Sequence, residues 1–219
     1  MIFFANCLRD SEQQRQILMK EVIMLVFWEQ RLVFLATPKA GSTAIAAALE
    51  PLAALSVQRP AVLKHTDVRG FAAHMGPFLA SAAGTPFAAV ALIRHPKAWL
   101  GSWYRNRQRD AEPGVSTKGV SFEDFVQGWC SDAPPAFANV GSQAAFLQPA
   151  PGVWLDRLFR YEEIGGFMHY LEERLEFEII LPRLNVSPPG DLALSAATAA
   201  LLENRAAADF TLYETLRPA

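Results

Sequence analysis

Residues 37–43 read Thr-Pro-Lys-Ala-Gly-Ser-Thr, a combination of residue types suited to binding a phosphate group. The segment follows a short apolar run, Leu32–Ala36, and precedes an Ala- and Leu-rich stretch, Thr43–Leu55. This pattern predicts a strand, a turn and a helix in succession. Because the N-terminus of a helix presents unpaired N–H groups and the positive end of a dipole, the turn is a candidate anion site.

The side chains of this turn add to the backbone donors. Gly41 allows close approach of the backbone, Ser42 and Thr43 carry hydroxyl donors, and Lys39 adds a mobile positive charge. The Walker pattern requires lysine directly after the last glycine, but here the lysine precedes it and the first glycine is absent. The segment therefore differs from that of an ordinary ATP or GTP hydrolase. A surface turn that ends in an N-cap serine is the alternative interpretation.

A second candidate phosphate site follows the apolar run Phe87–Ile93, which is typical of a strand buried on both faces. Arg94 comes directly after it, and Ser102 follows in the predicted next helix. An arginine at the carboxyl end of a strand points into the crevice where open α/β sheets bind ligands, and its fork suits a phosphate dianion. The alternative is an arginine paired with a carboxylate, with Ser102 as a packing residue.

Several residues could take a proton from a substrate. His65, in Lys64-His65-Thr66 between the two phosphate motifs, has a side-chain pKa suited to general base catalysis near neutral pH. His95, beside Arg94, is a second candidate. A carboxylate such as Glu162 remains an alternative base.

The two phosphate motifs together resemble those of the sulfotransferase family, in the patterns P-K-x-G-[ST]-[ST] and R-x-P-x-x-x-x-x-S-x-Y. The resemblance implies that the donor is 3′-phosphoadenosine 5′-phosphosulfate. It implies that Lys39 contacts the bridging oxygen and the transferring group, with the next four residues around the 5′-phosphate: Ala40, Gly41, Ser42 and Thr43. It also implies that Arg94 and Ser102 bind the 3′-phosphate and that His65 is the base.

Three later segments resemble carbohydrate-type sulfotransferases and their bacterial relatives. Residues 118–125 match K-G-x-S-F-x-x-F, Arg160-Tyr161-Glu162 matches R-[FY]-E, and residues 184–187 match L-N-x-S. The resemblance adds Arg160, Asn185 and Ser187 to the nucleotide site, although a structural ion pair is an equal interpretation of Arg160. The resemblance extends over residues 31–216.

The resemblance implies transfer of a sulfuryl group to a hydroxyl, on a carbohydrate or another hydroxyl-bearing small molecule, without a metal. A nucleotide or small-molecule kinase on a P-loop-like fold is one alternative, and a non-catalytic nucleotide-binding relative is another. Four aromatic residues could line the acceptor site or belong to the core: Trp103, Trp129, Phe137 and Trp154.

Strands that alternate with helices predict an α/β fold with a central parallel sheet and helices on both faces, which the phosphate loop makes P-loop-like. Predicted strands are Leu32–Ala36, Ala61–Leu63, Phe87–Ile93 and Val153–Tyr161. Predicted helices are Thr43–Leu55, Asp67–Ala83, Pro96 through Tyr104, Phe122–Trp129 with Ser121 as its N-cap, Glu163–Leu175 and Ser195–Leu216.

Composition sets the remaining expectations. The chain of 219 residues predicts a single domain over residues 24–219, with residues 1–23 as an extension or a docked tail. A net charge of −2 favours neither nucleic acid nor an acidic membrane as partner. Cys7 and Cys130 lack metal-ligand spacing, and charged residues interrupt the apolar stretch Val22–Ala36, so a cytoplasmic protein without stable membrane insertion is expected.

Overall fold

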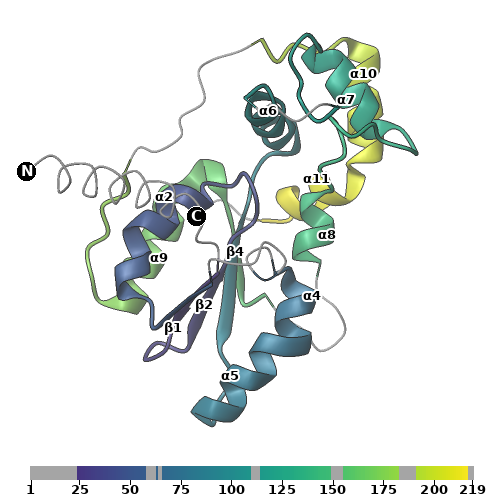
Figure 1. Cartoon of the computed structure of the whole chain (residues 1–219). Helices are drawn as coiled ribbons and strands as arrows, with labels where there is room; N and C mark the ends of the chain where they lie inside the picture. Colours follow the sequence, from purple (N-terminus) through teal and green to yellow (C-terminus); the bar gives the residue numbers. More distant parts are fainter. Residues whose placement is uncertain are drawn as a thin grey trace, which may run out of the picture.

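The computed structural model describes residues 24–57, 63, 66–109, 114–148, 155–182 and 191–216. Within these residues the chain forms an α/β structure around a five-stranded sheet, in the order β3-β1-β2-β4-β5. Figure 1 labels β1, β2 and β4, with helices on both sides of them. The strands are β1 (Met24–Phe27), β2 (Leu32–Leu35), β3 (Leu55–Val57), β4 (Ala88–Ile93) and β5 (Arg157–Arg160). Strands β2, β4 and β5 are parallel, whereas β1 runs antiparallel to β2 and β3.

The prediction of a wholly parallel sheet is therefore wrong, because β1 was not foreseen. β1 and β2 form a hairpin around the turn Trp28–Arg31, in which the Arg31 N–H donates to the Trp28 carbonyl at 3.2 Å. Arg31 has a φ of 51°, which is uncommon for a residue other than glycine. Its guanidinium stacks over the rings of Trp28 and Phe87, at 5.1 and 5.6 Å from the ring centroids. The turn contains no Gly, Pro, Asn or Asp, so the sequence carries no ordinary turn signal there.

Helices cover both faces of the sheet, as predicted, because the central strands are buried on both sides. Leu25, Phe34 and Leu92 belong to one core cluster, with residues of α2 (Ser42–Leu49) and α9 (Ile164–Leu175). The alternate strand residues belong to a second cluster on the other face. That face is covered by α4 (Val68–Gly70), the π-helical segment Phe71–Met75, α5 (Gly76–Ala83), α8 (Gln143–Leu147) and α11 (Ala207–Glu214).

A third core cluster lies among three helices beyond the end of β4 (Figure 1). These are α6 (Pro96–Arg107), α7 (Phe122–Cys130) and α10 (Ala196–Arg205). Trp99 and Leu100 of α6 pack in this cluster with Phe125 and Trp129 of α7, and Trp129 donates from its indole N–H to the Gly141 carbonyl at 2.8 Å. The cluster fixes α6, the helix that follows Arg94, against the rest of the molecule. Trp129 and the partly buried Phe137 are thus core residues, which was one of the two interpretations offered for them.

Several element boundaries differ from the prediction. α2 ends at Leu49 and continues as the 3-10 turn Glu50–Leu52, which contains Pro51. The third strand is β3, directly after this turn, whereas most of the predicted strand Ala61–Leu63 lies outside the described residues. The predicted closing helix is two helices, α10 and α11, which meet at Ala206.

The expected N-cap of α7 is confirmed. The Ser121 hydroxyl oxygen accepts a hydrogen bond from the Asp124 N–H at 3.0 Å, and the Asp124 carboxylate accepts from the Ser121 hydroxyl at 2.6 Å. The predicted extension, residues 1–23, lies outside the described residues. Across the part of the chain that is described, every helix is too short or too polar to cross a lipid bilayer.

Asp209 of α11 carries a testable prediction, because it is a buried carboxylate, only 4% exposed. Its Oδ1 accepts the Ala144 N–H at 2.7 Å, in the first turn of α8. Burial raises the pKa of the Asp209 carboxyl, although hydrogen bonds from the Ala144 and Gln143 N–H groups oppose the shift. The folded protein therefore binds this proton more tightly than the unfolded chain, whose Asp pKa is about 3.9.

The stabilisation from protonated Asp209 is present below the unfolded pKa and is lost as the pH rises through the raised folded pKa. Asp209→Asn keeps an amide oxygen for the Ala144 N–H and removes the charge. We expect the difference in melting temperature, variant minus wild type, to become more positive as the pH rises from 4 to 7. Asp132→Asn is the matched control, since that side chain is fully exposed at 102%. A constant difference across the pH range would contradict the assignment.

Candidate anion-binding site

The loop between β2 and α2 has the strand–turn–helix form that the sequence predicts. Gly41 is the N-cap of α2 and has a φ of 79°, a conformation that favours glycine. A Cβ at Gly41 would lie 2.5 Å from Cε2 of Tyr161, so the space above Gly41 is already filled by that ring. Gly41 thus allows the close approach of Tyr161. Ala40 and Ser42 are buried, and Thr43 is half-buried.

Lys39 sits at a strained point of this loop. Its φ of 64° lies in the left-handed region, which costs a residue with a side chain about 1–2 kcal/mol. Such strain persists only where the surrounding structure holds it, and it is found often at functional sites. Two neighbours hold the loop: the Trp99 indole N–H donates to the Pro38 carbonyl at 2.8 Å, and Nη1 of Arg94 donates to the Lys39 carbonyl at 3.2 Å.

The Arg94 contact brings the two predicted phosphate motifs together. The Arg94 guanidinium lies over the Tyr161 ring, 4.9 Å from its centroid, as well as against the Lys39 carbonyl. Its backbone is fixed on the other side, where the Gln143 side chain accepts the Arg94 N–H at 2.8 Å and donates to the Arg94 carbonyl at 2.6 Å. β4 and α8 thus position this arginine beside the loop between β2 and α2.

A further arginine, Arg105 of α6, lies near Arg94 and was not among the predicted site residues. Burial and the neighbouring Arg94 cation lower the pKa of the Arg105 guanidinium. The Nε atoms of both arginines are buried without a hydrogen-bond partner. Among the described residues, no carboxylate forms an ion pair with either side chain. The alternative of a strand-end arginine paired with a carboxylate is thus not found in the described part of the chain.

Ser102 is half-buried on α6 and is three residues before Arg105. Residues three apart are neighbours on a helix surface, so the hydroxyl and the second guanidinium share one face of α6. The spacing of Arg105 from Ser102 is the sequence feature that places both residues on this face, although the motif itself ends at Tyr104.

Trp103 of α6 is a second residue that the sequence did not single out for this loop. Nζ of Lys39 lies 4.5 Å from the centroid of the Trp103 ring, within the range of a cation–π contact. The Arg107 guanidinium lies at 5.8 Å from the same ring, and Nε1 of Trp103 is buried without a partner. Lys39 and Arg107 therefore lie against the Trp103 ring, and Arg94 lies against the Lys39 carbonyl. The Trp103 indole N–H in this group is buried without a partner.

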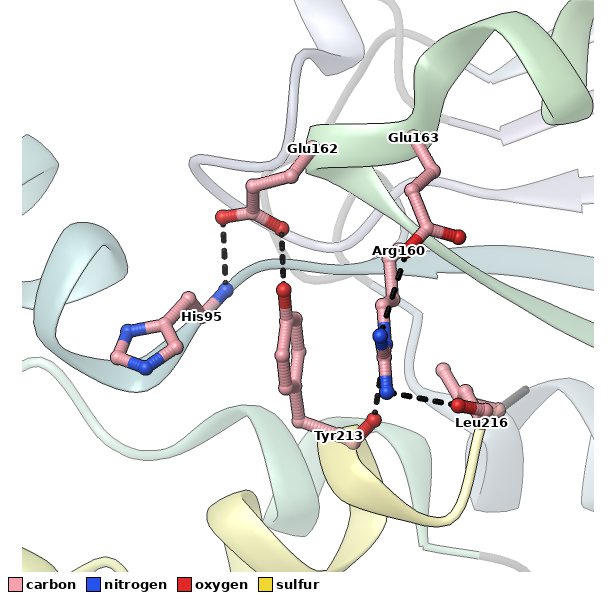
Figure 2. Close-up of polar contacts among 6 residues, drawn as sticks. All are labelled: His95, Arg160, Glu162, Glu163, Tyr213 and Leu216. Carbon is pink, nitrogen blue, oxygen red and sulfur yellow. Dashed lines mark hydrogen bonds and ion pairs between the residues drawn. The ribbon is translucent and has the colours of Figure 1, made fainter. Parts of the chain in front are cut away.

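Arg160 makes structural contacts. It forms an ion pair with Glu163 at 3.3 Å, and it donates to the carbonyls of Tyr213 at 3.2 Å and Leu216 at 2.7 Å (Figure 2). Its guanidinium also lies over the Tyr213 ring, 4.7 Å from the centroid. These contacts tie β5 to the end of α11 and agree with the structural interpretation of this arginine.

Glu162 and His95 are likewise engaged in contacts within the fold. Glu162 accepts the His95 N–H at 3.0 Å with one oxygen and the Tyr213 hydroxyl at 3.2 Å with the other (Figure 2). Burial and the Glu162 carboxylate raise the pKa of Tyr213. The His95 ring packs edge-on against Phe210 and Tyr213. Glu162 thus links the start of α6 to α11, and the His95 side chain packs against α11.

Three predicted site residues cannot be placed, because His65, Asn185 and Ser187 lie outside the described residues. The chain is described again from Thr66, and Asp67 caps α4 by accepting the Gly70 N–H at 2.7 Å. Trp154, one of the four aromatic candidates, also lies outside the described residues. Among the described residues, no group of three or more His, Cys, Asp or Glu side chains is arranged to hold a metal ion.

Residues 118–125 contact α6 directly and support it. The Tyr104 hydroxyl donates to the Val120 carbonyl at 2.8 Å, and the Tyr104 ring packs against Phe122 and Phe125. Glu123 accepts the Ser195 hydroxyl at 2.7 Å and so joins α7 to the start of α10. The segment therefore positions the helix that carries Ser102, Trp103 and Arg105.

Comparison with known proteins gives no relative. The sequence matches no protein-family model, no curated protein and no solved structure. What the chain does must therefore be inferred from its own residues.

Proposed function

We propose that this chain is a sulfotransferase that moves a sulfuryl group from 3′-phosphoadenosine 5′-phosphosulfate to an acceptor hydroxyl. The observation that carries the proposal is the pair Arg94 and Arg105, which lies beside the Lys39 loop without a carboxylate partner among the described residues. The donor has two separate phosphate positions, and the chain offers a site for each at the same edge of the sheet.

The first phosphate position is the N-terminus of α2, where a helix leaves its first N–H groups without intrahelical partners. Ser42 and Thr43 lie in that first turn, and the Lys39 side chain begins beside it. The parallel strands β2 and β4, with α2 directly after β2, support a P-loop-like arrangement of this region. A phosphate here would be held by backbone dipoles and by one mobile cation.

The second phosphate position lies at Arg94, Arg105 and Ser102. Two neighbouring cations repel each other, and buried guanidinium N–H groups without partners are unfavourable in a folded protein. A dianion between the two arginines would offset their repulsion, because a phosphate accepts several charge-assisted hydrogen bonds at once. The residues that are present therefore fit a nucleotide with a second phosphate, which ATP lacks at that position.

The donor supplies an activated sulfuryl group, whose transfer yields a sulfate ester and the bisphosphate and releases the proton of the acceptor hydroxyl. Lys39 and the N–H groups of α2 stabilise the negative charge that develops on the transferring group and on the bridging oxygen. Arg94 and Arg105 hold the nucleotide so that its reacting end stays beside Lys39, which is catalysis by positioning. His65 is the proposed base for the acceptor proton.

Calorimetric titration with 3′-phosphoadenosine 5′-phosphate, beside ATP, ADP and adenosine 5′-phosphosulfate, tests the proposed donor site. We expect the bisphosphate to bind most tightly, because it alone of these ligands presents a phosphate to Arg94 and Arg105. A preference for ATP would favour a kinase instead. Tight binding of the bisphosphate without turnover of any acceptor would indicate a non-catalytic nucleotide-binding protein.

A further inference from the structure

A cavity of about 280 Å³ lies directly beside the Lys39 loop. Thr37 and Pro38 form one wall, Trp99 of α6 lies next to them, and Asp67 at the start of α4 contributes a carboxylate. The remaining described lining comes from the segment that leads into α8 and from α8 itself: Val140, Gly141, Ser142, Gln143, Ala145 and Phe146. The cavity shares Gln143 with Arg94, so it adjoins the anion-binding site.

Most polar groups in the described cavity wall already have partners. The Trp99 indole N–H is bound to the Pro38 carbonyl, and the Ser142 hydroxyl oxygen accepts the Ala145 N–H at 3.1 Å. The Gln143 amide is bound at both ends to the backbone of Arg94. The wall offers a bound molecule mainly apolar and aromatic surface.

Thr37 is the exception, because it is 1% exposed and its hydroxyl oxygen is buried without a hydrogen-bond partner. Buried polar groups in native proteins nearly always have a partner, and Thr37 also lines the cavity, so rotation of its side chain toward the cavity would give this hydroxyl a partner in a bound molecule. A threonine hydroxyl can donate one hydrogen bond and accept others, which suits contact with another hydroxyl group. Thr37 is two residues before Lys39, so such a hydroxyl would lie near the transferring group.

The described cavity wall carries negative charge. Asp67 is the only ionisable residue among the described lining residues, and no lysine or arginine is among them. The Asp67 carboxylate disfavours an anionic ligand at its end of the cavity and favours a neutral or cationic one.

We propose that this cavity is the acceptor pocket and that it takes a small, flat phenol or apolar alcohol without negative charge. This inference rests on the proposed function, since it concerns the second substrate of the same site. The volume is just below the range of roughly 300–1,000 Å³ that holds drug-sized ligands, so it suits one or two rings. The pocket departs from the carbohydrate acceptor that the sequence resemblance implies.

A sugar ring fits this cavity less well for a physical reason. Its hydroxyls lie around the whole ring, and each needs a hydrogen-bond partner when it is buried. The described wall provides few polar groups for them: the Thr37 hydroxyl, the Asp67 carboxylate and the O–H of Ser142, whose oxygen already accepts the Ala145 N–H. A phenol presents a single hydroxyl and an apolar ring that can pack on Trp99 and Phe146.

The test is a binding measurement that needs no turnover. Tyramine, 4-hydroxyphenylacetate and glucose are titrated against the full chain by calorimetry, with and without saturating 3′-phosphoadenosine 5′-phosphate. We expect tyramine to bind more tightly than 4-hydroxyphenylacetate, and glucose to bind more weakly than tyramine. Asp67→Asn keeps an oxygen for the Gly70 N–H and should abolish the preference for tyramine over the anion.

Two matched variants, each with an alanine replaced by leucine, test whether tyramine binds in this cavity. Ala145→Leu places a larger side chain on the cavity wall and should weaken tyramine binding roughly tenfold, because packed sites tolerate added volume poorly. Ala208→Leu, on the exposed face of α11, should leave it unchanged. Tighter binding of glucose than tyramine, or an equal effect of both leucine variants, would overturn the proposal.

The same samples separate failure of this inference from failure of the proposed function. If the bisphosphate binds and tyramine does not, the acceptor pocket is wrong and the donor site stands. If tyramine binds as expected and the bisphosphate does not, the cavity is a phenol site but the sulfotransferase proposal fails.

Discussion

Replacement of Lys39 by alanine is expected to reduce turnover by roughly 100- to 1,000-fold or more, because it removes the only mobile cation on the loop itself. Loss of one preorganised group that stabilises developing charge has an effect of about that size in enzymes. The protein should remain folded. A φ of 64° strains alanine as much as lysine, so the substitution does not change the backbone strain. The lost contact with Trp103 contributes only about 0.5–1 kcal/mol to stability.

Turnover of 3′-phosphoadenosine 5′-phosphosulfate with a phenolic acceptor is the measurement, with circular dichroism and thermal unfolding as checks of folding. Lys118→Ala is the matched control, since Lys118 is an exposed lysine in the loop before α7 and should keep full activity. A Lys39→Ala protein that is folded and nearly fully active would contradict the proposed chemistry.

The sequence predicted the central part of the fold because the signals there are local. The continuous apolar run before Arg94 is found as β4, and the Ser121 cap begins α7 as expected. β1 was not predicted because its turn at Trp28–Arg31 is held by stacking of Arg31 on two aromatic rings, one of which comes from a distant segment. Contacts of that kind leave no local pattern in the sequence.

In the candidate site, too, the sequence predicted residues that lie in local motifs but not the contacts that depend on packing. The sequence named Lys39 and Arg94, and the structure adds the hydrogen bond between the Arg94 guanidinium and the Lys39 carbonyl. It could not foresee that Arg160 is bound to carbonyls near the end of the described chain, because that depends on where α11 ends. It also could not foresee that Arg105 lies near Arg94 without a carboxylate partner among the described residues, because that depends on how the chain packs.

The second large effect is expected at Arg94. Arg94→Ala should weaken binding of 3′-phosphoadenosine 5′-phosphate roughly 10- to 100-fold, since hydrogen bonds to charged groups contribute about 1.5–3 kcal/mol. Binding of adenosine 5′-phosphate, which lacks the second phosphate, should change much less. The ratio of the two affinities isolates the phosphate contact from general damage to the loop that Arg94 supports through the Lys39 carbonyl.

Arg105→Met tests the second arginine by two measurements, the affinity for the bisphosphate and the melting temperature. A purely structural arginine would not change them in opposite directions. The affinity for the bisphosphate should fall, while the melting temperature of the ligand-free protein should rise, because the substitution removes the repulsion from Arg94 and the desolvation of a half-buried guanidinium. Arg109→Ala, an exposed arginine just beyond the end of α6, should change neither. If Arg105→Met lowers the melting temperature and leaves bisphosphate affinity intact, Arg105 supports the fold and Arg94 acts without it.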